Sequence, residues 1–191
     1  MTTITREQVL EAAAQVFREK GFHAASMQDI AKTVKLQKAS LYHHVSSKQE
    51  MLVDILDQAL DVLIERMQTV VEQTMPPEDK LRLAVSTYLQ ALTERPNLAS
   101  VLLLEHRSLD AEYHQRHIPR RDRFENLWLD ILNEGVNQGT FICKNPSLAV
   151  KALLGIVNWT IMWYRPDGDL SPAQIATQSA DLFLNGLCVR E

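Results

Sequence analysis

Helix-start signals recur along the whole chain and constrain its fold more than any other feature. A Ser, Thr or Asn stands before an apolar run at several positions, followed either by Glu or Gln three residues later or directly by Pro. The clearest cases are Thr5, Ser47, Asn145 and Ser171. No segment alternates apolar and polar residues as a half-buried strand does. The sequence therefore predicts an all-α protein with about nine helices.

The apolar content supports a buried helical core, because hydrophobic residues make up 46% of the 191 residues. The longest apolar stretch, AVKALLGIVNWTIMWY, is interrupted by Lys151, Gly155 and Asn158. We interpret it as a buried helix and not as a membrane span. The N-terminus lacks the apolar core of a secretion signal. We expect a cytoplasmic protein that does not bind a membrane, with Cys143 and Cys188 as free thiols.

The charges are divided unevenly along the chain. The net charge is −4, but residues 1–50 carry seven Lys or Arg against five Asp or Glu. No acidic residue stands between Asp29 and Glu50, and this stretch contains Lys32, Lys35, Lys38 and Lys48. A lysine-bearing surface without carboxylates is what a polyanionic duplex attracts. The remainder is acidic, so we expect double-stranded DNA to bind only near the N-terminus.

Residues 26–52 predict two short helices, a tight turn between them and the capped start of a third helix. In a helix-turn-helix the second helix enters the major groove, and here that helix begins near Gln37. Gln37 and Lys38 suit base edges, whereas Tyr42 and Lys48 suit phosphates. We expect DNA contacts from Ser26, Gln28, Gln37, Lys38, Ala39, Ser40, Tyr42, His43, His44 and Lys48.

The N-terminal third of the chain resembles part of a known protein family. The strings VLEAAAQVFREKGFHAASMQDIA and IAKTVKLQKASLYHHVSSKQEML resemble the head of the TetR family of transcriptional regulators. Three positions depart from that pattern: Lys35 replaces a frequent glycine at the turn, Gln37 a serine and Val45 a phenylalanine. Lys35 would then need a backbone conformation that favours glycine, at an energetic cost.

The resemblance implies a helix-turn-helix DNA-binding domain at 1–46 and a ligand-binding, dimer-forming helical body at 47–191. It implies a homodimeric repressor that a small-molecule effector releases from a palindromic operator. The segment 146–164 is apolar nearly all round, and such a helix must be covered on all sides. Together with the last helix it could pair with a second copy in a four-helix contact.

The body also resembles a subgroup of the family that senses acyl-CoA thioesters in fatty-acid, steroid or aromatic-acid catabolism. The strings GIVNWTIMWYRPDGDLSPAQIATQSADLFLNGL and VLLLEHRSLDAEYHQRHIPRRDRFENLWLDILNEGVNQGTF carry this likeness. Apolar and aromatic side chains would line the pocket, and a few polar groups and arginines would orient the ligand. The expected ligand-binding residues are Leu103, Glu105, His106, Arg107, Arg120, Arg121, Phe124, Trp128, Asn158, Trp159 and Met162.

Other functions remain open at the level of sequence. No nucleophile elbow, phosphate-binding glycine loop or Rossmann fingerprint is present, so we expect no enzyme and no resident cofactor. His114 and His117 are three residues apart and could make the chain a metal-responsive regulator. Cys143 and Cys188 could serve as a redox switch. A helical interaction module without DNA binding is a further alternative.

Overall fold

The computed structural model describes residues 4–187, which form ten α-helices and one 3-10 helix and no β-sheet. This confirms the predicted all-α class. Cys188 lies outside the described residues. The helices are α1 (Arg6–Lys20), α2 (Met27–Thr33), α3 (Lys38–Leu41), α4 (Lys48–Val71), α5 (Pro77–Glu94), α6 (Pro96–Leu104), η1 (His106–Ser108), α7 (Ala111–Asn137), α8 (Pro146–Asn158), α9 (Thr160–Trp163) and α10 (Pro172–Leu187).

The chain divides into two compact units that do not follow the order of the sequence. One unit contains Met1–Asp61 and Arg95–Arg120, and the other contains Val62–Glu94 and Arg121–Glu191. Two long helices, α4 and α7, each contribute residues to both units. The first unit therefore includes the predicted head together with α6, η1 and the starts of α4 and α7.

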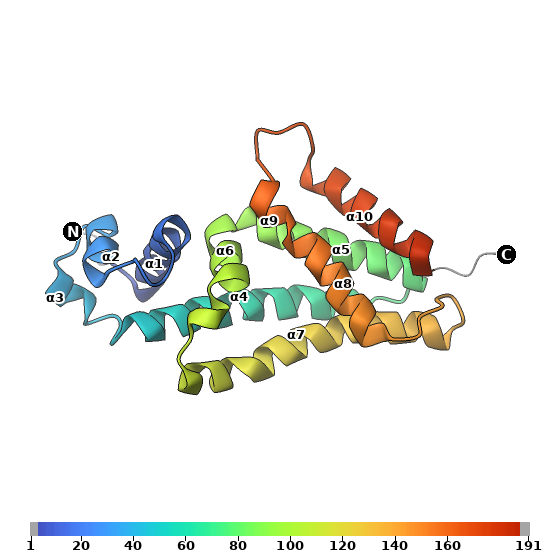
Figure 1. Ribbon diagram of the computed structural model, residues 1–191, viewed down its shortest axis with the longest axis horizontal. Helices are drawn as coiled ribbons and strands as arrows, with labels where there is room; N and C mark the ends of the chain where they lie inside the picture. Colours follow the sequence, from blue (N-terminus) through green and yellow to red (C-terminus); the bar gives the residue numbers. More distant parts are fainter. Residues whose placement is uncertain (1–3, 188–191) are drawn as a thin grey trace. The chain divides into compact units, whose positions relative to one another are not determined.

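In the first unit, α1 packs against α2 and α6 (Figure 1). The side chain of Thr5 accepts a hydrogen bond from Gln8, and the Gln8 side chain accepts one from the Thr5 backbone, as the sequence predicts for a capping box. The core of the head is formed by Val9, Ala13, Phe17, Phe22, Ile30, Ala31, Leu41 and Val45. Burial of these side chains fixes which faces of α2 and α3 point outward.

In the second unit, α10 lies along α5 and also contacts α8 (Figure 1). The Asn145 side chain accepts a hydrogen bond from the Leu148 backbone, and Pro146 occupies the first helical position of α8. This cap agrees with the sequence prediction. The largest fully buried side chains of this unit include Trp128 and Tyr88.

The prediction of one buried helix up to Trp163 is wrong for the single chain. The window from Pro146 to Trp163 has a mean hydropathy of 1.2 and would cross a membrane by length and composition alone, yet only 22% of it is buried. The segment also divides into α8 and α9 at Trp159. Val150, Leu153 and Val157 face inward, and no element of the described chain covers the opposite face of α8.

Candidate nucleic-acid interface and ligand pocket

The start of α2 is held by a reciprocal set of hydrogen bonds. The backbone N–H of Asp29 donates to Ser26 Oγ at 3.2 Å, and the Asp29 carboxylate accepts from the Ser26 N–H at 3.0 Å. Lys20 Nζ donates to the same carboxylate at 2.8 Å. These bonds, led by the one from Lys20, hold the pKa of Asp29 well below its usual range. The one carboxylate at this edge is therefore paired with a cation of α1.

The turn between α2 and α3 has the backbone conformation that the sequence predicts. Lys35 has a φ of 55°, in the left-handed region that favours glycine. The following N–H, of Leu36, donates to Ala31 O at 2.8 Å and closes the turn. The turn is therefore retained although a lysine stands where a glycine would be less strained.

The second helix of the motif is short, because α3 spans only Lys38–Leu41. Its N-cap, Gln37, makes no side-chain cap hydrogen bond, so the amide remains available for an outside partner. Leu41 and Val45 are buried in the head. Of the predicted DNA-contact residues, Ser26, Gln28, Gln37, Lys38, Ala39, Tyr42 and His43 are exposed, and Ser40 and His44 are half-buried.

The last predicted DNA contact, Lys48, has partners inside the head. Its ammonium donates to the carbonyl oxygens of Phe22 at 2.6 Å and Ala25 at 2.8 Å, and lies 4.4 Å from the centroid of the Phe22 ring. The amine therefore fixes the start of α4 to the bend between α1 and α2. In this geometry Lys48 positions the motif, and Tyr42, 47% exposed, is the better placed phosphate donor.

The cap of α4 differs by one residue from the predicted box. The Glu50 N–H donates to Ser47 Oγ at 3.0 Å, as expected, but the Glu50 carboxylate accepts from the backbone and side chain of Ser46 instead of Ser47. These two bonds lower the pKa of Glu50, and Arg6 of α1 adds a further contact at 3.3 Å. The head is thereby tied to α4 at a second point.

The residues predicted to bind a ligand fall into both compact units. Leu103, Glu105, His106, Arg107 and Arg120 belong to the first unit, and the other six belong to the second. Glu105 accepts a hydrogen bond from Ser108 Oγ at 3.1 Å, and the same hydroxyl lies 3.4 Å from His23 in the α1–α2 bend. The end of α6 is thus a contact to the head, which the sequence did not reveal.

Three of the six predicted ligand residues in the second unit come together around Tyr88, which was not predicted from the sequence. The rings of Phe124 and Trp128 lie 5.3 and 5.6 Å from the Tyr88 ring. The Tyr88 hydroxyl donates to Asn158 Oδ1 at 2.7 Å, and burial raises the pKa of Tyr88 well above its usual value. The sequence signal that could have identified Tyr88 is the apolar stripe of the helix at 78–94, to which this residue belongs. These four residues, Tyr88, Phe124, Trp128 and Asn158, are called the aromatic cluster below.

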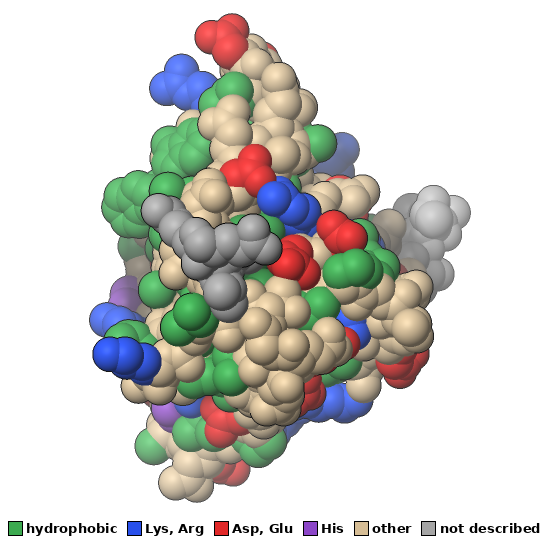
Figure 2. Space-filling model, turned by 90° about the vertical axis from the view of Figure 1, so that its right-hand side faces the viewer, with side chains coloured by type: hydrophobic (Ala, Val, Ile, Leu, Met, Phe, Trp, Pro, Cys, Tyr) green, Lys and Arg blue, Asp and Glu red, His purple; other side chains and the backbone are tan. Residues whose placement is uncertain are grey.

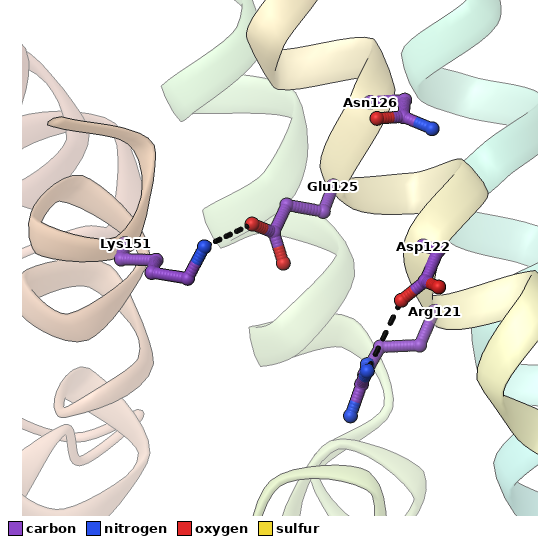
Figure 3. Close-up of a pocket in the computed structure, with 5 residues that line it drawn as sticks. All are labelled: Arg121, Asp122, Glu125, Asn126 and Lys151. Carbon is purple, nitrogen blue, oxygen red and sulfur yellow. Dashed lines mark hydrogen bonds and ion pairs between the residues drawn. The ribbon is translucent and has the colours of Figure 1, made fainter. Parts of the chain in front are cut away.

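A pocket of about 590 Å³ opens between α7 and α8 (Figure 3). Its lining residues are Arg121, Asp122, Glu125, Asn126 and Lys151. Lys151 of α8 donates to Glu125 at 2.7 Å, and Arg121 donates to Asp122 at 3.1 Å. The volume lies in the range of small-molecule sites. Arg121 is the one predicted ligand residue that lines this pocket.

Trp159 and Met162, which the sequence placed in the ligand pocket, are 64% and 54% exposed. They lie beyond the inward-facing stripe of α8, so the structure does not support a pocket-lining role in the single chain. Ile156 and Leu148 of α8 and Leu182 of α10 are also exposed, by 42%, 63% and 67%. Figure 2 shows surface hydrophobic side chains gathered at its upper left, with few charges among them.

Arg120 is already engaged in an ion-pair network between α4 and α7. It lies 3.0 Å from both Asp57 and Asp61, and His117 Nδ1 lies 2.9 Å from the buried Asp57 carboxylate. No group of three potential metal ligands comes together within residues 4–187. The histidine pair proposed for metal sensing therefore lacks a third ligand there.

The fold and the exposed helix-turn-helix are those of a class: the DNA-binding transcriptional regulators with a helical body. Residues 9–55 match the family described as "Bacterial regulatory proteins, tetR family", and residues 74–187 match "Tetracyclin repressor-like, C-terminal domain". The chain belongs to the TetR family.

Known relatives match this chain nearly end to end. The HTH-type transcriptional repressor KstR2 of Mycobacterium tuberculosis is 30% identical over 95% of this chain and 92% of its own length. The crystal structure of PfmR from Thermus thermophilus has a TM-score of 0.85 and 37% identity, covering 93% of this chain and 97% of PfmR. AibR, solved with isovaleryl coenzyme A and operator DNA, has a TM-score of 0.85 and 26% identity, covering 93% and 96%.

Proposed function

We propose that this TetR-family regulator is a cytoplasmic homodimeric repressor that binds a palindromic operator and releases it when an acyl-CoA thioester binds its body. The observation that carries the proposal is the outward face of α2, the turn and α3. Lys32, Lys35 and Lys38 are exposed there, and no carboxylate of the described chain pairs with them. The similarity to AibR, a protein solved with both operator DNA and an acyl-CoA, supports the effector class.

The exposed face supports a division of labour between base and phosphate contacts. Gln37 and Lys38 begin α3 and would meet base edges in the major groove, where Gln suits adenine and Lys suits guanine. Ala39 carries only a methyl group and permits close approach. Tyr42 would donate to a phosphate and set the register of the helix.

The exposed apolar side chains of α8 and α10 support the homodimer. Leu148, Ile156, Trp159 and Leu182 would be covered by the same helices of a second copy, in a two-fold four-helix contact. Ala152 and Gly155 lie on the exposed side of α8, and small residues there allow two helices to approach closely. Two heads on one dimer would read two half-sites of one operator.

Helix α4 provides the covalent route between effector and operator. Residues 48–61 of α4 belong to the unit that contains the head, and residues 62–71 belong to the unit that contains the pocket. An effector that binds better to the form with unsuitably spaced heads would shift the population toward it, by no more than its differential affinity. Equal head-to-head distances with and without effector, measured between spin labels, would contradict this mechanism.

The test is fluorescence anisotropy with a labelled duplex from the DNA upstream of the chain's own gene. We expect tight binding at 50 mM salt and a loss of about 10³-fold or more at 200 mM, because a dimer neutralises several phosphates. Gln37→Ala should cost about 1–3 kcal/mol and relax the base preference at one position per half-site. Gln115→Ala, an exposed glutamine of α7, is the matched control and should bind normally. Absence of any duplex preference at low salt would refute the proposal.

A further inference from the structure

The indole of Trp128 is the one buried side chain with a polar atom that lacks a partner among the described residues. Its ring is 0% exposed, and its Nε1–H meets no hydrogen-bond acceptor. A tryptophan Nε1–H can only donate a hydrogen bond, so only an acceptor atom can satisfy it. Buried donors without a protein partner are rare and unfavourable, and a bound molecule can supply the acceptor.

The surroundings of this donor restrict the acceptor that can reach it. The rings of Tyr88 and Phe124 lie 5.6 and 6.3 Å from the indole in T-shaped arrangements, and the Tyr88 hydroxyl already donates to Asn158 at 2.7 Å. Apolar walls disfavour a charged oxygen, because a carboxylate would lose its hydration there. A neutral carbonyl oxygen, attached to an apolar chain or ring, satisfies both conditions.

Most of the pocket lining and the indole belong to the same helix, α7. Arg121, Glu125 and Trp128 are spaced i, i+4 and i+7 on α7, so they lie along one side of the helix. Along this side of α7, Arg121 and Glu125 therefore precede Trp128 by about two turns and one turn. A ligand with a polar end and an apolar end fits this order of side chains.

We propose that Trp128 Nε1–H donates a hydrogen bond to the thioester carbonyl oxygen of the effector, with the acyl group among the aromatic side chains and the coenzyme toward Arg121 and Lys151. This inference rests on the proposed acyl-CoA response and adds the group that distinguishes a thioester from other acyl compounds. Binding supplies the acceptor that the free protein lacks. The effector thereby gains affinity for the form in which the carbonyl reaches Trp128.

The test compares isovaleryl-CoA with its thioether analogue S-isopentyl-CoA, which has the same carbon skeleton without the carbonyl. Calorimetry should show that the wild type prefers the thioester by about tenfold, the contribution of one buried hydrogen bond. Trp128→Phe keeps an aromatic ring and removes the donor, so it should bind both compounds equally. Trp163→Phe, at a tryptophan that is 47% exposed, should retain the preference.

A second measurement does not depend on a variant being stable. With ¹⁵N-indole tryptophan, the wild-type resonance assigned to Trp128 should move downfield when isovaleryl-CoA is added. The inference is overturned if the wild type does not distinguish thioester from thioether, or if acyl-CoA releases DNA while this resonance stays unchanged. If no acyl-CoA between acetyl and octadecanoyl binds at all, the effector class proposed above fails and this inference fails with it.

Discussion

Replacing Asp57 by Asn should destabilise the protein by about 1–2 kcal/mol, because one carboxylate joins α4 to α7. The Asp57 side chain is 8% exposed, with His117 Nδ1 at 2.9 Å and Arg120 Nη1 at 3.0 Å. A carboxylate only accepts, so both neighbours must donate to it. Asp57 therefore links the two long helices within the unit that contains the head.

The magnitude follows from the number of bonds and from exposure. A hydrogen bond to a charged group contributes about 1.5–3 kcal/mol, and an asparagine can keep one of the two bonds with its amide oxygen. The Arg120 side chain is 40% exposed and also lies 3.0 Å from Asp61, so water and Asp61 offset part of the loss. The loss of stability expected for Asp57→Asn therefore lies between two limits. A surface ion pair contributes roughly 0–1 kcal/mol, and a fully buried pair that loses one partner costs roughly 3–5 kcal/mol.

Urea unfolding followed by circular dichroism, at one fixed protein concentration, measures the change. We expect a lower midpoint for Asp57→Asn with an unchanged slope, since the fold is the same. Asp61→Asn is the matched control: it contacts the same arginine but is 60% exposed, and it should change stability by no more than about 0.5 kcal/mol. If both variants lose equal stability, burial does not decide the strength of these bonds and the reasoning is wrong.

Three further outcomes are expected. Lys35→Gly should stabilise the head by up to about 1 kcal/mol in thermal unfolding, because it relieves the left-handed backbone, and Lys35→Ala should not. The lowered pKa values of Asp29 and Glu50 contribute stability that is present above their unfolded pKa near 4 and is lost as the pH falls below it. The urea midpoint should therefore drop below about pH 4, and less steeply in Ser26→Ala, which removes a partner of Asp29. Leu182→Asp on α10 should yield a monomer with weak operator binding in sedimentation and anisotropy experiments, whereas Leu104→Asp, at another exposed leucine, should remain dimeric.

Several local features could be predicted because their causes lie within a few residues. The caps at Thr5 and Asn145 join residues that are three apart, so a short stretch of sequence contains both partners. The strained turn at Lys35 could be predicted for the same reason, from the departure from glycine in a recognisable motif. Outward and inward faces of α2 and α3 then follow from which residues are apolar.

The ligand pocket could be predicted only in part, because its contacts join distant residues. Phe124, Trp128 and Asn158 were proposed from their residue types, but Tyr88, which brings them together, lies 70 residues from Asn158. Trp159 and Met162 have the same apolar character and were proposed on the same grounds, yet they are exposed. Hydrophobicity indicates that a side chain will be covered, but does not indicate whether its own chain or a second copy covers it.

The sequence alone determined the class of this protein: helices with marked starts, a helix-turn-helix with a carboxylate-free outer face, and an apolar segment that needs a cover. These properties depend on neighbours within a few residues or on charge along one short stretch. Only the tertiary structure decided that Lys48 braces the head, that Asp57 joins α4 to α7 and that the Trp128 donor is left without an acceptor. Each of these depends on which helices pack together, and packing is set by the whole core at once.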